Sequence, residues 1–280
     1  HRHWCLNYCY HGPHRLDNKK VKKMIFTASQ QPVFDDPNEN LECILDVLDT
    51  NSDSDWILTP EGSLSGYCLN QTHEKNNPEY TEALKKLEKY LLDNRRNLAL
   101  GTGHIEPDNL PYNQIRVYRE GVLQGAYNKQ LLTNDVGAMG EYYFYAPGNS
   151  CNYFYLDHIN TFKASALICN DVWAFPRMSP RGNPYFYREI SNACAQVVFV
   201  SVNCCTDEFD QTVYNFHESH LRLLSKQFNI HTVVSSACTD MKGGEYNHKV
   251  QCPSGIIDPN GEWVKKCKDV GMDSVSVEIK

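Results

Sequence analysis

The sequence has 280 residues, of which 41% are apolar and 22% charged, and it contains no low-complexity tract. This composition is that of an ordinary globular protein, and the length suits one large core in a single domain. The net charge of −7 disfavours nonspecific binding to nucleic acid or anionic membrane. No apolar run approaches the roughly 20 residues that span a bilayer, and no segment has the long apolar centre of a secretory signal peptide. We therefore expect a cytoplasmic protein whose partner is a small molecule.

Residues 1–23 differ from the rest because they follow neither a helical nor a strand period. We expect them to lie outside the fold, and the domain to comprise residues 24–280. Four histidines and two cysteines occur in this segment, but their spacing fits no zinc motif, so we predict no metal site. The whole chain has 12 cysteines, several in or beside apolar runs, and we expect reduced thiols instead of disulfides.

The first half of the domain alternates between strand and helix patterns. Short apolar runs predict strands at residues 24–30, 56–59, 98–103, 114–119 and 122–127. Apolar residues that recur at helical spacing predict two helices, at residues 38–49 and 78–95. The Glu120-Gly121 pair indicates a hairpin turn between the last two of these strands.

The second half continues the same alternation. Apolar runs predict strands at residues 153–156, 162–168, 196–202, 231–236 and 274–279. Helical spacing predicts helices at residues 184–193 and 212–228. A Pro-Asn-Gly turn predicts a hairpin at residues 256–263. A mixed α/β fold with two sheets and outer helices accommodates all of these elements.

A carboxylate, an ammonium and a thiol each follow a short apolar run, at Glu61, Lys129 and Cys169. They would meet if those runs were neighbouring strands of one sheet. Together they would form an acyl-transfer site, because a thiolate attacks a carbonyl, a carboxylate carries protons, and a cation with a backbone N–H stabilises the oxyanion. Taken singly, the three residues have simpler interpretations as an exposed turn, a surface lysine and an inert core thiol.

Three segments resemble, in order and spacing, the Glu-Lys-Cys signature of the nitrilase superfamily, the carbon-nitrogen hydrolases: TPEGSLSGY at 59–67, YNKQLL at 127–132 and ALICNDVW at 166–173. Further segments look like landmarks of the family: LPYN at 110–113, YAPG at 145–148 and SGIIDPNG at 254–261. The resemblance covers Met24 to Lys280. It implies a single domain with a four-layer α-β-β-α sandwich, assembled as a homodimer or a higher homo-oligomer.

The resemblance also implies a role for each residue of the signature. Cys169 would be the nucleophile and would form a thioester with the acyl part of the substrate. Glu61 would accept the thiol proton, pass it to the leaving amine and then activate water. Lys129 would hold the oxyanion, together with the backbone N–H of Asn170.

A second acid often accompanies the triad in this family, and Glu141 in the Gly140-Glu141-Tyr-Tyr segment is our candidate. It would position Lys129 and relay protons, and the nearby Asp135 is the alternative. Other residues close to the three segments are expected to bind the substrate in the pocket: Tyr67, Asn170, Trp173 and Asn203.

The family's nitrile-cleaving members tend to have tryptophan directly after the cysteine, whereas this chain has Asn170. The expected reaction is therefore hydrolysis of a non-peptide C–N bond in a small amide or N-carbamoyl compound, with release of ammonia or an amine and without a cofactor. Arg177 and Arg181 follow Cys169 closely enough to provide a clamp for a substrate carboxylate.

Other functions stay open at this point. A catalytically silent member would keep the fold as a binding or scaffolding module, although three buried charges cost free energy unless they are paired. An acyltransferase or a nitrilase of the same family is a further alternative. His217 and His220 are not spaced as in the His-Glu-x-x-His zinc motif, and a papain-like partnership with Cys169 would be redundant beside Glu61 and Lys129.

Overall fold

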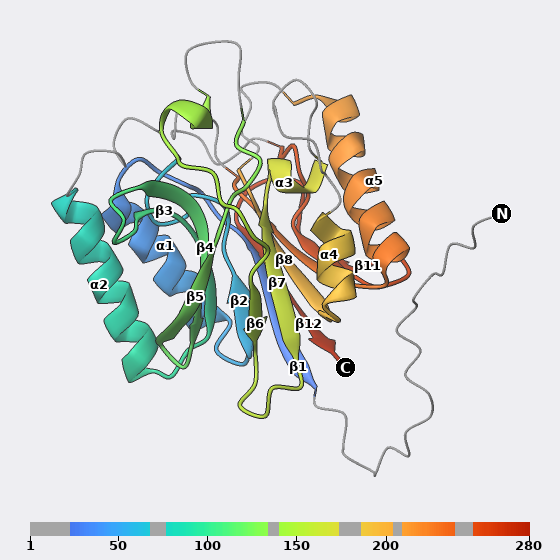
Figure 1. Ribbon diagram of the computed structural model, residues 1–280, viewed down its shortest axis with the longest axis horizontal. Coiled ribbons are helices and arrows are strands. Elements are labelled where there is room, and N and C mark those ends of the chain that lie inside the picture. Colours follow the sequence, from blue (N-terminus) through green and yellow to red (C-terminus); the bar gives the residue numbers. More distant parts are fainter. Residues whose placement is uncertain (1–22, 68–76, 134–139, 174–185, 204–208, 239–248) are drawn as a thin grey trace.

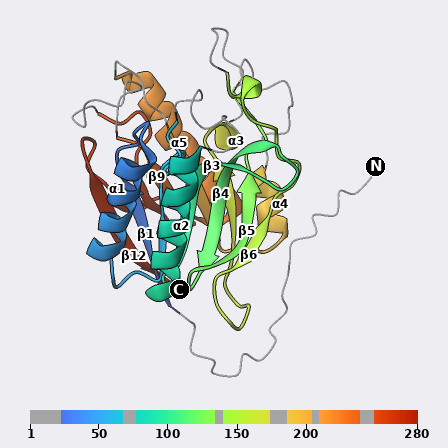
Figure 2. The ribbon, with the colours of Figure 1, turned by 90° about the vertical axis from the view of Figure 1, so that its left-hand side faces the viewer.

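Two six-stranded sheets lie face to face between outer helices, as the two views of the computed structural model show (Figures 1 and 2). The predicted α-β-β-α sandwich is confirmed. The structure describes residues 23–67, 77–133, 140–173, 186–203, 209–238 and 249–280. The predictions for residues 1–22, for Asp135 and for Arg177 and Arg181 fall outside these ranges. No helix within these ranges is long and apolar enough to cross a membrane.

The first sheet has the strand order β12-β1-β2-β3-β4-β5. Its strands are β1 (Met24–Gln30), β2 (Trp56–Leu58), β3 (Leu98–Ile105), β4 (Pro111–Arg119), β5 (Val122–Asn128) and β12 (Asp273–Ile279). The central strands β1, β2 and β3 are parallel, and β4 and β12 are antiparallel to their neighbours. Glu120 and Gly121 have φ of 49° and 78°, which confirms the predicted tight hairpin turn between β4 and β5.

The second sheet has the strand order β11-β10-β9-β8-β7-β6. Its strands are β6 (Tyr153–Tyr155), β7 (Lys163–Ile168), β8 (Val197–Val202), β9 (His231–Ser236), β10 (Gly255–Ile257) and β11 (Trp263–Lys266). Again the central strands, β7, β8 and β9, are parallel. All six residues of β8 are buried, because helices cover one face of this sheet and the first sheet covers the other.

Helices form the two outer layers. On the first sheet lie α1 (Pro37–Thr50) and α2 (Pro78–Asp93), and on the second lie α4 (Phe186–Asn192) and α5 (Gln211–Phe228). Three of them begin at a residue whose side chain accepts hydrogen bonds from the first turn: Asp36, Asn77 and Asp210. Two short elements, α3 (Asn170–Trp173) and the 3-10 turn η1 (Glu141–Tyr143), were not predicted from the sequence. Both are too short to show a periodic pattern.

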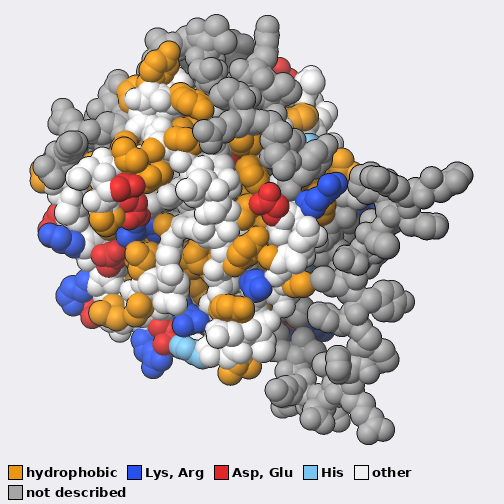
Figure 3. All heavy atoms as spheres, in the orientation of Figure 1, with side chains coloured by type: hydrophobic (Ala, Val, Ile, Leu, Met, Phe, Trp, Pro, Cys, Tyr) orange, Lys and Arg blue, Asp and Glu red, His pale blue; other side chains and the backbone are white. Residues whose placement is uncertain are grey.

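The two sheets meet in an apolar core to which both contribute. Phe199 of β8 is fully buried, and its ring centroid lies 6.1 Å from that of Phe26 on β1 and 6.1 Å from that of Trp56 on β2. Outside the core, positive and negative side chains intersperse along the left and lower edge of the surface (Figure 3). Exposed ion pairs such as Arg95–Glu120, whose charged atoms lie 2.9 Å apart, each contribute little to stability.

The strands that precede Glu61, Lys129 and Cys169 are not neighbours in one sheet. The arrangement that we expected to bring these three residues together is therefore not the one observed. The strands β2 and β5, which precede Glu61 and Lys129, are separated by β3 and β4, and β7, which precedes Cys169, belongs to the other sheet. The three groups come together because β2, β5, β7 and β8 all end at the same edge of the sandwich. Asn203, just after β8, donates its backbone N–H to Glu61 Oε2 at 2.8 Å across that edge.

Candidate active site

Glu61 lies in the turn that follows β2. Thr59 and Ser63 hold this turn on β3, because Gly101 N donates to Thr59 Oγ1 at 3.0 Å and Ser63 Oγ donates to Gly101 O at 2.9 Å. The strand passes so close that a Cβ on Gly101 would lie 2.1 Å from Pro60 O. Glycine at this position therefore lets the turn bring the Glu61 carboxylate into the interior, where its side chain is fully buried.

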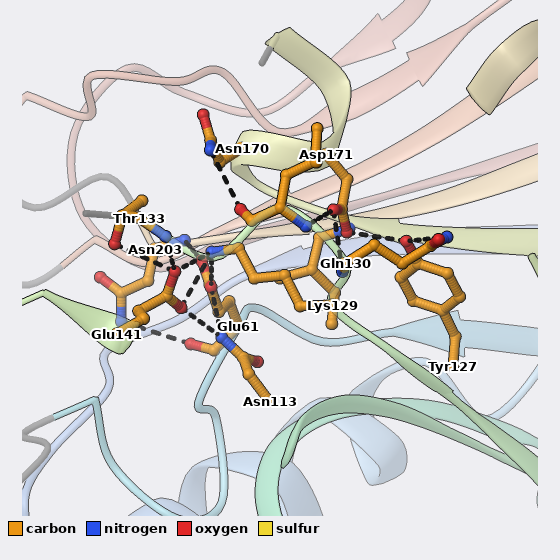
Figure 4. Close-up of polar contacts among 12 residues, drawn as sticks. Glu61, Asn113, Tyr127, Lys129, Gln130, Thr133, Glu141, Asn170, Asp171 and Asn203 are labelled. Carbon is orange, nitrogen blue, oxygen red and sulfur yellow. Dashed lines mark hydrogen bonds and ion pairs between the residues drawn. The ribbon is translucent and has the colours of Figure 1, made fainter. Parts of the chain in front are cut away.

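Lys129 follows β5, and its backbone is held on both sides. Its N–H donates to Asn113 O at 2.8 Å, and its carbonyl accepts from Gly148 N at 2.8 Å. The ammonium Nζ lies 2.8 Å from Glu61 Oε1 and 2.8 Å from Glu141 Oε2 (Figure 4). Because the lysine is fully buried, this pairing is what makes its charge tolerable.

Glu141 begins the turn η1 and supplies the second carboxylate. Thr133 donates to Glu141 Oε2 from its backbone N at 2.8 Å and from its hydroxyl at 3.0 Å. Burial by itself would raise the pKa of Glu141, but Lys129 and the hydrogen bonds from Thr133 and Asn113 outweigh burial and lower it. Glu141 therefore stays ionised at neutral pH as the counter-ion of Lys129.

Glu61 differs from Glu141 in its proton affinity. Burial raises the pKa of Glu61 to about 7, with the charge of Glu141 acting in the same direction and Lys129 against it. For Lys129, burial would lower the pKa, but the charges of Glu141, Glu61 and Cys169 raise it well above its usual range. Glu61 is thus the member of the cluster that exchanges a proton near pH 7.

Cys169 lies directly after β7, where the chain turns sharply into α3. Its φ of 45° belongs to the left-handed region that non-glycine residues rarely adopt. The turn is held because Cys169 N donates to Ser201 O at 2.9 Å and Val172 N donates to Cys169 O at 3.0 Å. Cys169 retains 8% exposure, whereas Glu61 and Lys129 have none, so it is the most solvent-exposed residue of the three.

Asp171 links the backbone just after Lys129 to the turn at Cys169, although no sequence pattern marked it as a site residue. Its buried carboxylate accepts four hydrogen bonds of 2.7 to 3.1 Å, from the N–H groups of Gln130, Leu131 and Ile168 and the hydroxyl of Tyr127 (Figure 4). Burial raises the pKa of Asp171 to about 6, against the effect of these bonds. An acid two residues after Cys169, directly before the apolar pair Val172-Trp173, was the available signal.

The four predicted substrate-binding residues lie at or near this cluster. Asn203 also donates its side-chain amide to Glu61 O at 3.3 Å, and Asn170 Nδ2 donates to Leu131 O at 3.0 Å. Burial, with the charges of Glu61 and others in the site, raises the pKa of Tyr67. The ring of Trp173 lies 4.3 Å from that of a histidine on α5. Substrate contact by these four residues stays a prediction.

The two histidines of α5 have backbone partners. His217 Nδ1 donates to Gln251 O at 2.9 Å, and its ring is the one beside Trp173. His220 Nε2 donates to Val172 O at 3.1 Å. Burial lowers the pKa of both rings, so both are neutral at pH 7. Within the described ranges, no three His, Cys, Asp or Glu side chains are grouped as a metal ion would require.

Asn113 and Thr133 are the other site residues that sequence reasoning missed. Asn113 Nδ2 donates to Glu61 Oε1 and to Glu141 Oε1, each at 2.7 Å. A polar residue on the apolar face of an alternating strand was the available signal for Asn113. Thr133 follows only the apolar pair Leu131-Leu132 and belongs to no predicted element, so no sequence pattern marked it as a site residue.

No protein-family model matches this sequence. A glutamine-dependent NAD(+) synthetase from Acinetobacter baylyi is 26% identical over 215 residues, which cover 75% of this chain and 35% of that protein. A protein of the same description from Thermotoga maritima is 24% identical over 269 residues, 92% of this chain and 42% of that protein. The chain therefore spans less than half the length of these curated relatives.

Solved structures share the fold. An amidase from Nesterenkonia sp. AN1 matches with a TM-score of 0.74 at 19% identity, covering 91% of this chain and 90% of that one. A glutamine-dependent NAD+ synthetase from Acinetobacter baumannii also gives 0.74 at 19% identity, covering 92% of this chain and 46% of that one. The Nesterenkonia amidase is described as a member of the nitrilase superfamily. In fold, this chain is therefore similar to an amidase of the nitrilase superfamily, and in sequence it is similar to glutamine-dependent NAD(+) synthetases.

Proposed function

We propose that this chain hydrolyses the C–N bond of a small amide through a thioester on Cys169. The observation that carries the proposal is the buried cluster of Glu61, Lys129 and Glu141, two carboxylates on one ammonium, at the sandwich edge where β7 delivers Cys169. A fold kept only for binding has no need of three buried charges, which cost free energy even when they are paired.

The first half of the reaction transfers the acyl group to sulfur. Glu61 accepts the proton of the Cys169 thiol as the sulfur attacks the carbonyl carbon of the amide. The carbonyl oxygen becomes an oxyanion that Lys129 and the backbone N–H of Asn170 stabilise. When the tetrahedral adduct collapses, the C–N bond breaks and protonated Glu61 gives its proton to the leaving nitrogen. Ammonia or an amine departs and the thioester remains.

The second half returns the enzyme to its starting state. Glu61, again a carboxylate, takes a proton from water as the water oxygen attacks the thioester carbonyl. Collapse breaks the C–S bond, the proton returns to sulfur and a carboxylic acid is released. Glu141 keeps Lys129 charged and in place during both halves, because it remains ionised while Glu61 gains and loses its proton.

A specific amide is favoured by the sequence relatives. Both are described as glutamine-dependent NAD(+) synthetases, and this chain spans only 35% and 42% of their lengths. The second candidate function is therefore hydrolysis of the side-chain amide of glutamine, to glutamate and ammonia. Other small amides and N-carbamoyl compounds are the competing substrates. Acyl transfer to an amine, the implied homodimer and a cytoplasmic location stay predictions.

The test is ammonia or amine release from a panel of L-glutamine, simple aliphatic amides and N-carbamoyl compounds. Intact mass after acid quench records any acyl adduct on the protein. We expect turnover of at least one class and an adduct that Cys169→Ala abolishes. The matched control is Cys194→Ala, which removes an exposed cysteine of the described chain and should leave both readouts unchanged.

The outcomes separate the alternatives. Release from glutamine far above that from simple amides would select the second candidate. An adduct that persists in Cys169→Ala would overturn the assignment of the nucleophile. Binding of panel compounds without turnover or adduct would point to a catalytically silent member that keeps the fold for recognition.

A further inference from the structure

Asn113 is a polar residue on the apolar inner face of β4. Ile115 and Val117, the next residues on that face, are fully buried in the core between the sheets. Successive residues of a strand alternate between its faces, so Gln114 belongs to the outer face. There Gln114 Nε2 donates to Glu106 Oε1 at 2.7 Å. The side-chain amides of Asn113 and Gln114 thus lie on opposite faces of the same sheet.

The Asn113 amide bridges the two buried carboxylates of the site. Its Nδ2 reaches Oε1 of Glu61 and Oε1 of Glu141, both at 2.7 Å. Lys129 Nζ donates to the same two oxygens, at 2.8 and 2.9 Å (Figure 4). Two oxygens of like charge therefore share two nitrogen donors. The backbone carbonyl of Asn113 also accepts the backbone N–H of Lys129 at 2.8 Å, so one residue contacts both carboxylates and the backbone of the residue that carries the ammonium.

The chemistry of the carboxylates fixes the orientation of this amide. An ionised carboxylate only accepts hydrogen bonds, so the NH₂ of Asn113 must face both of them. The buried Oδ1 of Asn113 has no hydrogen-bond partner among the residues that the structure describes. An unpaired buried carbonyl oxygen costs stability. The NH₂ group of Asn113 is therefore fully used by the two carboxylates, whereas its buried carbonyl oxygen gains no hydrogen bond from the described residues around it.

We propose that Asn113 is a positioning residue that holds Glu61 and Glu141 on Lys129 and keeps Glu61 available as a base at neutral pH. The geometry stands by itself, whereas the role of Glu61 as base rests on the proposed function. Hydrogen bonds to an ionised carboxylate favour that form and lower its pKa, and Asn113 acts on Glu61 in this direction. Removing the amide should therefore make Glu61 harder to ionise.

The experiment compares Asn113→Ala with Gln114→Ala, which removes a buried amide one residue away on the opposite face. The first readout is ¹³C NMR titration of glutamate side-chain carboxyl groups in labelled protein, with Glu61 assigned through Glu61→Gln. It needs no turnover. We expect the Glu61 titration midpoint to rise by about one pH unit in Asn113→Ala and to stay in place in Gln114→Ala.

The second readout is the pH profile of kcat/KM on the substrate found in the panel. In Asn113→Ala the rate at pH 7 should fall about tenfold, with part of the loss recovered at pH 9, because a larger fraction of Glu61 is ionised there. A purely structural role would lower the rate equally at every pH. Asn113→Ser, which keeps one donor, should give an intermediate midpoint, and it replaces Asn113→Ala if that variant does not fold.

An unchanged Glu61 midpoint in the Asn113 variants, or an equal shift in Gln114→Ala, would overturn the proposal. If the NMR midpoint rises but no panel compound is hydrolysed, the role of Asn113 in setting the charge state stands and the proposed hydrolysis fails. The two ideas are thus tested separately.

Discussion

At the scale of single residues, the site contains two glutamates in the same buried cluster with different proton affinities. Glu141 accepts two hydrogen bonds from Thr133 in addition to its contacts with Lys129 and Asn113, whereas the Glu61 carboxylate has, within the described part of the chain, one further donor, the N–H of Asn203. Fewer donors leave burial dominant at Glu61, so its pKa rises to about 7 while that of Glu141 falls. One carboxylate can then carry protons while the other holds the lysine.

This asymmetry predicts the acid side of the pH profile. Because Glu61 must be ionised to accept the Cys169 proton, kcat/KM should fall as the pH drops through about 7, to about a tenth at pH 6. Glu61→Gln should lower the rate by about a thousandfold or more at every pH, because glutamine cannot carry the proton. Initial rates of the wild type and of Glu61→Gln, measured between pH 5 and 9 in buffers of constant ionic strength, test both the pH profile and the rate loss. A plateau that extends unchanged to pH 5 would contradict the assignment of Glu61 as base.

At the scale of the elements, close approach between neighbouring segments sets the position of each group. The turn that carries Glu61 lies on β3 because Gly101 has no side chain. Asp171, in the turn after Cys169, accepts hydrogen bonds from the backbone N–H groups just after Lys129 and so holds the two segments together. Helical and strand periods predicted the elements themselves from the sequence. They did not predict these contacts, since each contact joins residues far apart along the chain.

Gly101→Ala tests the close approach. A Cβ there would lie 2.1 Å from Pro60 O, a backbone atom that can move only with the Glu61 turn. We expect a loss of about 3 kcal/mol in the free energy of unfolding and a loss of activity of about tenfold or more. The control is Gly103→Ala on the same strand, where the Cβ would meet the hydroxyl end of the Tyr145 side chain at 2.7 Å. Side-chain ends can shift, so we expect about 1 kcal/mol or less. Equal losses in both variants, measured by urea denaturation, would refute this reading.

At the scale of the whole molecule, the site depends on two sheets being packed face to face. Glu61 and Lys129 come from the first sheet and Cys169 from the second, so the proposed catalytic groups are aligned only while the core between the sheets is intact. Phe199 lies in that core against Phe26 and Trp56. Stability and catalysis are therefore coupled through the inter-sheet packing.

Phe199→Ala should destabilise the protein by about 3–5 kcal/mol, because it leaves a cavity at a fully buried position between the sheets. The melting temperature should fall by about 10 °C, measured by circular dichroism. Phe199→Leu, which fills most of the volume, should cost less than about 1.5 kcal/mol. Comparable losses for alanine and leucine would show that packing volume is not what this ring contributes.

The sequence by itself determined the order of strands and helices and the segments that carry Glu61, Lys129, Glu141 and Cys169. These are local properties, since the hydrophobic period and the spacing of a motif depend on residues that are close together in the sequence. Only the tertiary structure decided that Cys169 belongs to the opposite sheet from Glu61 and Lys129, and that Asn113, Thr133 and Asp171 complete the site. The pairing of strands and the burial of charge depend on residues far apart in sequence, and such contacts exist only once the sandwich has closed.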